Sequence, residues 1–165
     1  MYIPLATKSA YSLLESTIRL PQYVQKAHEY HYEALGLMDH NALHGTIEFY
    51  QLCQKAKIKP IIGLLLDISF EDETSYPFYF VAKSFTGYQQ LMELSTKKML
   101  GESPIMQEEQ RMTDVAILIP KETAQTTVFS ALLENKHSWL SMNVTDVFFC
   151  VTPTNLGEED FYSYQ

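Results

Sequence analysis

The chain has 165 residues, with 12 basic and 20 acidic side chains, so its formal net charge is −8 when the histidines are neutral. Apolar residues make up 46% of the chain and charged residues 19%, which is typical of a single globular domain and excludes a disordered one. The longest apolar run, residues 61–66, is far shorter than the roughly 20 residues of a membrane-spanning helix, which excludes that class of protein.

The charge is divided unevenly along the chain. Residues 1–60 carry six basic and five acidic groups, whereas residues 61–165 carry six basic and fifteen acidic groups, and Arg19 and Arg111 are the two arginines. A protein that binds DNA by itself needs clustered lysine and arginine side chains to displace counterions from the phosphates. The lysines at 55–59 and 97–98 are interpreted as helix ends, so we predict no autonomous DNA binding.

The N-terminal residues and the two cysteines both indicate a reducing, cytoplasmic compartment. The first residues lack the basic and apolar regions of a signal peptide, which indicates a cytoplasmic protein. Cys53 and Cys150 lie 97 positions apart, a spacing that matches no metal or redox motif. We therefore expect buried thiols in a reducing compartment.

Strands and helices alternate along the chain. Apolar spacing and β-branched content predict, in order, a strand at 2–7, a helix at 21–31, a strand at 34–38, a helix at 43–57, strands at 60–66 and 78–82, a helix at 88–99, a strand at 115–119, a helix at 124–133 and a strand at 147–151. The low-periodicity segment 101–113 is interpreted as a mobile insertion. This rhythm predicts an α/β fold with a mostly parallel sheet, open or closed into a barrel.

The segment 39–44 is the first candidate site, because functional groups of such folds lie where strands end. It places Asp39 and His40 directly after a buried strand and His44 four residues later. Carboxylate and imidazole groups suit zinc or manganese, but the same residues fit a capping aspartate and hydrogen-bonded histidines, and both interpretations stay open. His28 and His31 are interpreted as surface or capping residues.

Five separate motifs between residues 2 and 63 resemble a known family. They are Ser9–Glu15, Ala34–Gly45, Glu48–Tyr50, Cys53–Ala56 and Ile58–Gly63, and Ala82–Ser84 with Gly87–Met92 extend the match to about residue 96. Together they are similar to the PHP (polymerase and histidinol phosphatase) domain at the N-terminus of bacterial DNA polymerase III alpha subunits. The resemblance implies an irregular seven-stranded α/β barrel, incomplete in residues 1–165, with the domain and a polymerase continuing beyond Gln165.

The resemblance also implies a damaged metal site. The family's opening H-x-H ligand pair falls on Ala6 and Lys8, and the glutamate expected two residues after Gly63 is Leu65. Of the ligand positions that align, Asp39 and His40 are retained, and two ligands do not build a multinuclear site. His44 matches a position that is not a ligand in the family. We therefore predict no catalytic residue and no metal or cofactor in this chain, with magnesium expected only in the polymerase domain of the parent chain.

Three functions follow from these observations. The first is a catalytically inactive PHP domain that serves as the N-terminal scaffold of a replicative polymerase, with the rest of the alpha chain and other replisome subunits as partners. The second is an active metal-dependent phosphoesterase or 3′–5′ exonuclease, and the third is an unrelated α/β binding module. For Lys8 two interpretations stay open: its ammonium replaces the missing metal charge beside Asp39, or it is a solvent-exposed lysine.

Overall fold

The computed structural model describes residues 3–69, 75–102, 112–120, 123 and 144–150. The elements in chain order are α1 (Leu20–Glu29), β1 (Ala34–His40), α2 (Thr46–Ala56), β2 (Lys59–Ser69), β3 (Ser75–Ala82), α3 (Phe85–Met99), β4 (Met112–Pro120) and β5 (Val144–Cys150). This order confirms the predicted α/β class. The predicted helix at 124–133 and most of the predicted insertion at 101–113 lie outside the described residues.

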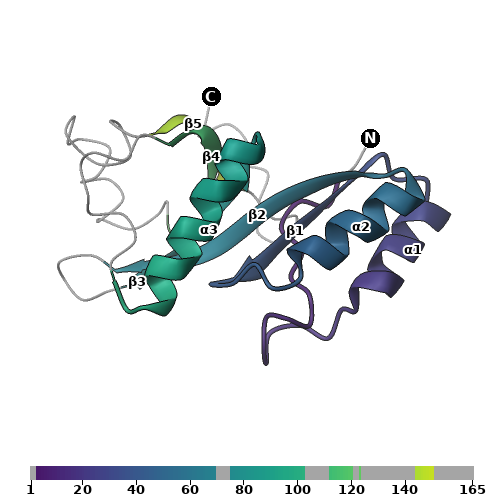
Figure 1. Cartoon of the computed structure of the whole chain (residues 1–165), viewed down its shortest axis with the longest axis horizontal. Helices are drawn as coiled ribbons and strands as arrows, with labels where there is room; N and C mark the ends of the chain where they lie inside the picture. Colours follow the sequence, from purple (N-terminus) through teal and green to yellow (C-terminus); the bar gives the residue numbers. More distant parts are fainter. Residues whose placement is uncertain (1–2, 70–74, 103–111, 121–122, 124–143, 151–165) are drawn as a thin grey trace, which may run out of the picture.

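The strands form one mixed sheet in the order β1-β2-β3-β4-β5 (Figure 1). β1 pairs with β2 and β4 with β5 in parallel, whereas β2 pairs with β3 and β3 with β4 in antiparallel fashion. The prediction of a mostly parallel sheet is therefore wrong. Residues 70–74 are too short a connection for the crossover that a parallel β2–β3 pair would need. Five strands are described, so the seven-stranded barrel stays a prediction.

Two buried apolar clusters hold the elements together. One lies between the sheet and α3 and includes Leu66, Phe80 and Leu91, and the other joins α1, α2 and β1. In α1, Leu20, Val24 and Ala27 are buried at the three- and four-residue spacing that places them on one helix face, as the sequence predicts. Among the described residues no helix is both long and apolar enough to cross a membrane.

The N-terminal segment, residues 3–7, lies beside β1 and positions the loop that follows it at the end of that strand. The amide of Gly36 donates to the carbonyl of Pro4 and the amide of Met38 to that of Thr7, each at 2.8 Å. Described residues 3–7 are not a regular strand, which corrects the prediction of a strand at 2–7. A side chain at Gly36 would place its Cβ 2.2 Å from the carbonyl oxygen of Leu5, so this close approach requires glycine.

Candidate functional site

The carboxylate of Asp39, at the end of β1, is buried, with 2% of the residue exposed. It accepts three hydrogen bonds from the loop that follows the N-terminal segment. The Ser9 amide and the Ser12 hydroxyl donate to Oδ1 at 2.6 and 2.7 Å, and the Ser9 hydroxyl donates to Oδ2 at 2.7 Å. Both serines are buried as well. These donors provide the compensation that a buried carboxylate requires.

The Ser12 hydroxyl links Asp39 to the next residue of the chain. Its oxygen accepts a hydrogen bond of 3.0 Å from the backbone amide of His40 while its proton is donated to Asp39. Both functions of this hydroxyl are therefore used inside the protein.

The imidazole of His40 lies between two carboxylates. Its Nδ1 contacts Glu15, and its Nε2 lies 2.8 Å from Oδ2 of Asp67 on β2. Both contacts are N–H donations at the same time only in the doubly protonated ring. Because the two nitrogens face different carboxylates, Glu15, His40 and Asp67 do not converge on one point. Within the described part of the chain, no group of three or more histidine, cysteine, aspartate or glutamate side chains is arranged to hold a metal ion.

Lys8 completes this group of charges, but not as the sequence predicts. Its ammonium pairs with Glu15 instead of Asp39, so the prediction of a Lys8–Asp39 pair is wrong. Asp39 is already satisfied by two serines, which leaves it no need of a cation. The hydrogen bond from Lys8, followed by that from His40, holds the pKa of Glu15 below its usual value, although burial acts in the opposite direction. We call Lys8, Glu15, His40 and Asp67 the charge cluster.

The three positions that the family resemblance assigns to missing ligands lie in three different settings. Ala6 is exposed, Lys8 lies in the charge cluster, and Leu65 is buried with 3% of the residue exposed. In the β1–β2 register Leu65 is the partner of His40. Asp67 lies two residues further on β2, on the same face as Leu65, and its carboxylate reaches His40. A carboxylate therefore contacts this histidine although the partner position holds leucine.

The remaining candidate residues lie apart from the site. His28, His31 and His44 are exposed, in line with the surface interpretation of the first two. Cys53 is buried and free, as predicted, and burial raises the pKa of its thiol to about 11. For Cys150 the structure describes the backbone within β5 and not the side chain.

Sequence reasoning missed four members of the site: Ser9, Ser12, Glu15 and Asp67. The three-residue spacing of Ser9, Ser12 and Glu15 was a usable signal, because hydroxyl and carboxylate groups at that spacing suit a tight turn that bonds to a neighbouring strand end. Asp67 directly follows the apolar run at 61–66. A charged residue inside a strand that continues to Ser69 is itself a signal of a polar partner.

Comparisons with known proteins agree on a family. A family model described as the PHP domain matches residues 4–150. DNA polymerase III subunit alpha of Streptococcus pyogenes is 33% identical over 122 residues, which are 74% of this chain and 12% of that protein. The protein of the same name in Bacillus subtilis (strain 168) is 37% identical over 97 residues, which are 58% of this chain and 9% of that protein. The chain thus spans only a small part of the length of these relatives.

Two solved structures show weaker likeness. An amidohydrolase from Chromobacterium violaceum, with bound sulfate and no metal, has a TM-score of 0.45 and 15% identity over 59% of this chain and 34% of its own. A putative metal-dependent phosphoesterase from Bifidobacterium adolescentis has a TM-score of 0.44 and 10% identity over 84% of this chain and 45% of its own.

Proposed function

The chain belongs to the PHP domain family, and from this premise we propose that it is the N-terminal scaffold domain of a cytoplasmic replicative DNA polymerase, without metal-dependent catalysis of its own. The family match rules out the interpretation as an unrelated α/β module. The identity to the alpha subunits of two bacteria supports placement within a polymerase chain. Nucleotidyl transfer, with its magnesium, belongs in this proposal to a separate domain of that chain.

The proposal rests on the observation that the polar atoms of the site already bond to other groups of the protein. Asp39 accepts three hydrogen bonds from two buried serines, and both nitrogens of His40 face carboxylates. A divalent metal binds through lone pairs that are free to coordinate it. Here a metal would have to displace bonds that the fold already makes.

The residues at the family's ligand positions do not fit its metal centre either. Ala6 offers only a methyl group, and Leu65 is a buried hydrocarbon. Lys8 brings a positive charge, which repels a cation. The charge cluster then does structurally what a bound metal does, because it ties the loop at Lys8 and Glu15 to the ends of β1 and β2.

Hydrolysis assays with added manganese or zinc test the inactive state. The chain is incubated with bis-p-nitrophenyl phosphate and with single-stranded DNA labelled at its 5′ end, with a His40→Ala variant in parallel. We expect no metal-dependent product from either protein. Hydrolysis by the unaltered chain that the His40→Ala variant loses would support the phosphoesterase or exonuclease alternative and contradict the scaffold proposal.

Primer extension tests the second half of the proposal. An alpha chain that begins with this segment should extend a DNA primer with magnesium, and it should extend it equally well when His40 is alanine. If His40→Ala lowered both primer extension and metal-dependent hydrolysis, the site would still be catalytic, which would contradict the proposal.

A further inference from the structure

Residues 3–18, which we call the strap, contact the rest of the protein mainly through polar groups. The hydroxyl of Tyr23 on α1 lies 2.7 Å from that of Thr7, and the Tyr11 hydroxyl donates to Glu48 on α2 at 3.0 Å. These contacts add to the backbone hydrogen bonds with β1 and to the serine bonds with Asp39 described above. Polar contacts therefore hold the strap along its whole length.

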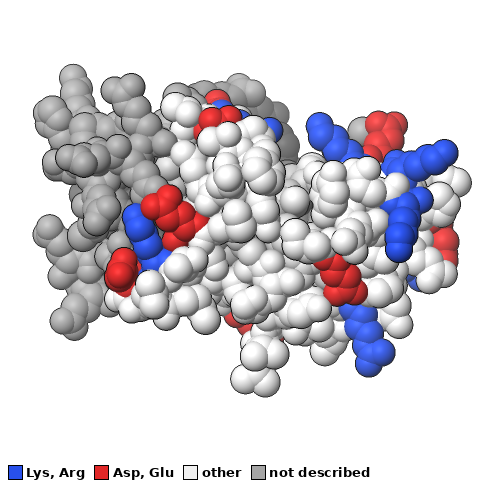
Figure 2. Space-filling model, in the orientation of Figure 1, with Lys and Arg blue, Asp and Glu red and all other residues white. Residues whose placement is uncertain are grey.

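The apolar clusters do not hold the strap. Neither cluster includes any of its residues, all of which the structure describes. Its two buried side chains are serines, whereas five of its large apolar side chains are exposed: Leu5, Tyr11 and Ile18 by 38, 44 and 40%, Leu13 by 81% and Leu14 completely. Figure 1 shows the loop of the strap (purple) at the lower edge of the molecule, and Figure 2 shows uncharged side chains protruding there. Because little apolar surface is buried under the strap, the hydrophobic effect contributes little to holding it closed.

The strap is also bonded to itself, which makes its loop a unit. The amide of Ala10 donates to the carbonyl of Ile18 at 2.8 Å, and the hydroxyl of Ser16 donates to the carbonyl of Lys8 at 2.7 Å. The ion pair between Lys8 and Glu15 closes the same loop. These bonds stay intact when the loop moves away from β1.

One residue of the closed strap is strained. Leu14 has a φ of 64°, in the left-handed region, which a leucine adopts at a cost in energy. Its side chain is fully exposed, so no burial offsets this cost. Release of the loop would relieve the strain.

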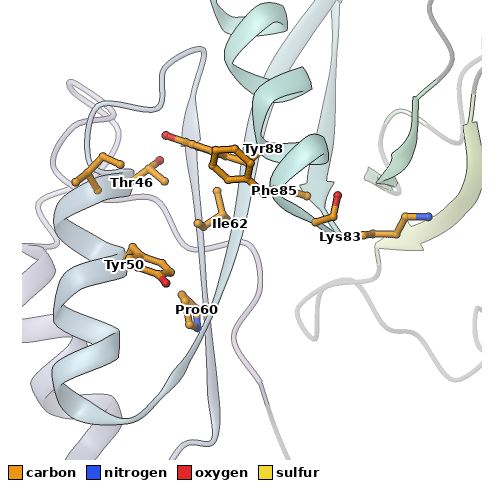
Figure 3. A pocket seen from close by; sticks show the side chains of 10 residues that line it. Thr46, Tyr50, Pro60, Ile62, Lys83, Phe85 and Tyr88 are labelled. Carbon is orange, nitrogen blue, oxygen red and sulfur yellow. The ribbon is translucent and has the colours of Figure 1, made fainter.

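The other elements pack against one another without the strap. The sheet joins all five strands, and α3 covers one of the two apolar clusters. Between α2 and α3 lies a groove of about 500 Å³, where Tyr50 and Tyr88 point into the space between the helices and Ile62 of β2 forms the floor (Figure 3). None of the residues that line this groove belongs to the strap. Loss of the strap contacts would leave these contacts in place.

We propose that the strap opens as one unit while the sheet and the helices stay folded. When it is closed, it covers the outer edge of β1 and the Asp39 carboxylate. When it is open, the amides of Gly36 and Met38 and the Asp39 carboxylate meet water. The strap thus controls access to this end of the sheet. Because the device depends only on contacts within the chain, it does not depend on the proposed function.

Amide hydrogen exchange, measured by NMR at several urea concentrations below the unfolding transition, tests the proposal. The amides of Gly36 and Met38 donate to the strap and report its opening. Phe80, fully buried in the central strand β3, reports global unfolding. Gly36 and Met38 should exchange at least about tenfold faster than Phe80, and their rates should rise less steeply with urea, because opening exposes less surface than unfolding does. Equal rates and equal urea dependence for the three amides would overturn the proposal.

Two variants separate opening of the strap from unfolding of the core. Ile119→Val, at a fully buried position of β4, should speed exchange at Phe80 by about fivefold and change Gly36 and Met38 by less than about twofold. Ser12→Ala should speed exchange at Gly36 and Met38 by the same factor, at least about tenfold. Acceleration of all three amides by Ile119→Val would overturn the proposal, and so would a Ser12→Ala effect at Met38 that is absent at Gly36, because the strap would then fray instead of opening as one unit.

Discussion

Replacing Ser12 by alanine removes a hydroxyl that makes one buried and one partly buried hydrogen bond. It donates to the Asp39 carboxylate at 2.7 Å and accepts from the His40 amide at 3.0 Å. A hydrogen bond to a charged group contributes about 1.5–3 kcal/mol, and a buried amide left without an acceptor costs about 1–3 kcal/mol. Because Ser9 still donates twice to Asp39, we expect a combined loss near the lower end, about 3 kcal/mol in the free energy of unfolding.

Urea denaturation of the 165-residue chain measures this loss. With a denaturant slope of about 2 kcal/mol/M, the midpoint of Ser12→Ala should fall by about 1.5 M. Ser69→Ala is the matched control, since the Ser69 hydroxyl is exposed and makes one long contact of 3.4 Å with Ser75, and it should change stability by about 0.5 kcal/mol or less. Equal midpoints for the two variants would refute the view that the serines hold Asp39 in place.

Three further predictions concern neighbouring residues. In the folded protein the pKa of Glu15 lies below its usual value of about 4.5. Its contribution to stability is therefore complete above pH 4.5 and is lost as the pH falls through the folded pKa. The difference in urea midpoint between the unaltered chain and Glu15→Gln should shrink from about pH 7 to about pH 3, and a constant difference would contradict this. Lys8→Met should cost about 1 kcal/mol or less at pH 7, because the Lys8–Glu15 pair lies near the surface, and a loss of 3 kcal/mol would instead restore the Lys8–Asp39 prediction. Lys57 ends α2 with a φ of 57°, so Lys57→Gly should raise the melting temperature by an amount equivalent to about 0.5–1 kcal/mol, whereas Lys55→Gly, inside the helix, should lower it.

Sequence patterns predicted the elements well where one face of a helix or strand is buried. The spacing of Leu20, Val24 and Ala27 located α1, and the apolar run at 61–66 located the centre of β2. Strand direction was harder, because apolar periodicity does not record which way a strand runs. The two predicted strands at 60–66 and 78–82 leave residues 67–77 between them, and the structure extends both strands so that only residues 70–74 connect them.

The site was predictable in its position and not in its bonding. Asp39 and His40 stood out because they follow a buried strand, and the structure places both at the strand end. The partners of Asp39 come from a loop about 30 residues earlier in the chain, and that pairing depends on the approach of the N-terminal segment to Gly36. Long-range contacts of this kind leave no periodic signal, which is why Lys8 was assigned to the wrong carboxylate.

We propose that internal hydrogen bonds and ion pairs occupy the place where the family binds its metals. Elemental analysis of the purified chain, after exposure to manganese and zinc and then dialysis, tests it most directly. We expect far less than one equivalent of either metal per chain, and the same low value for His40→Ala. One tightly held manganese or zinc per chain, lost in the His40→Ala variant, would contradict it.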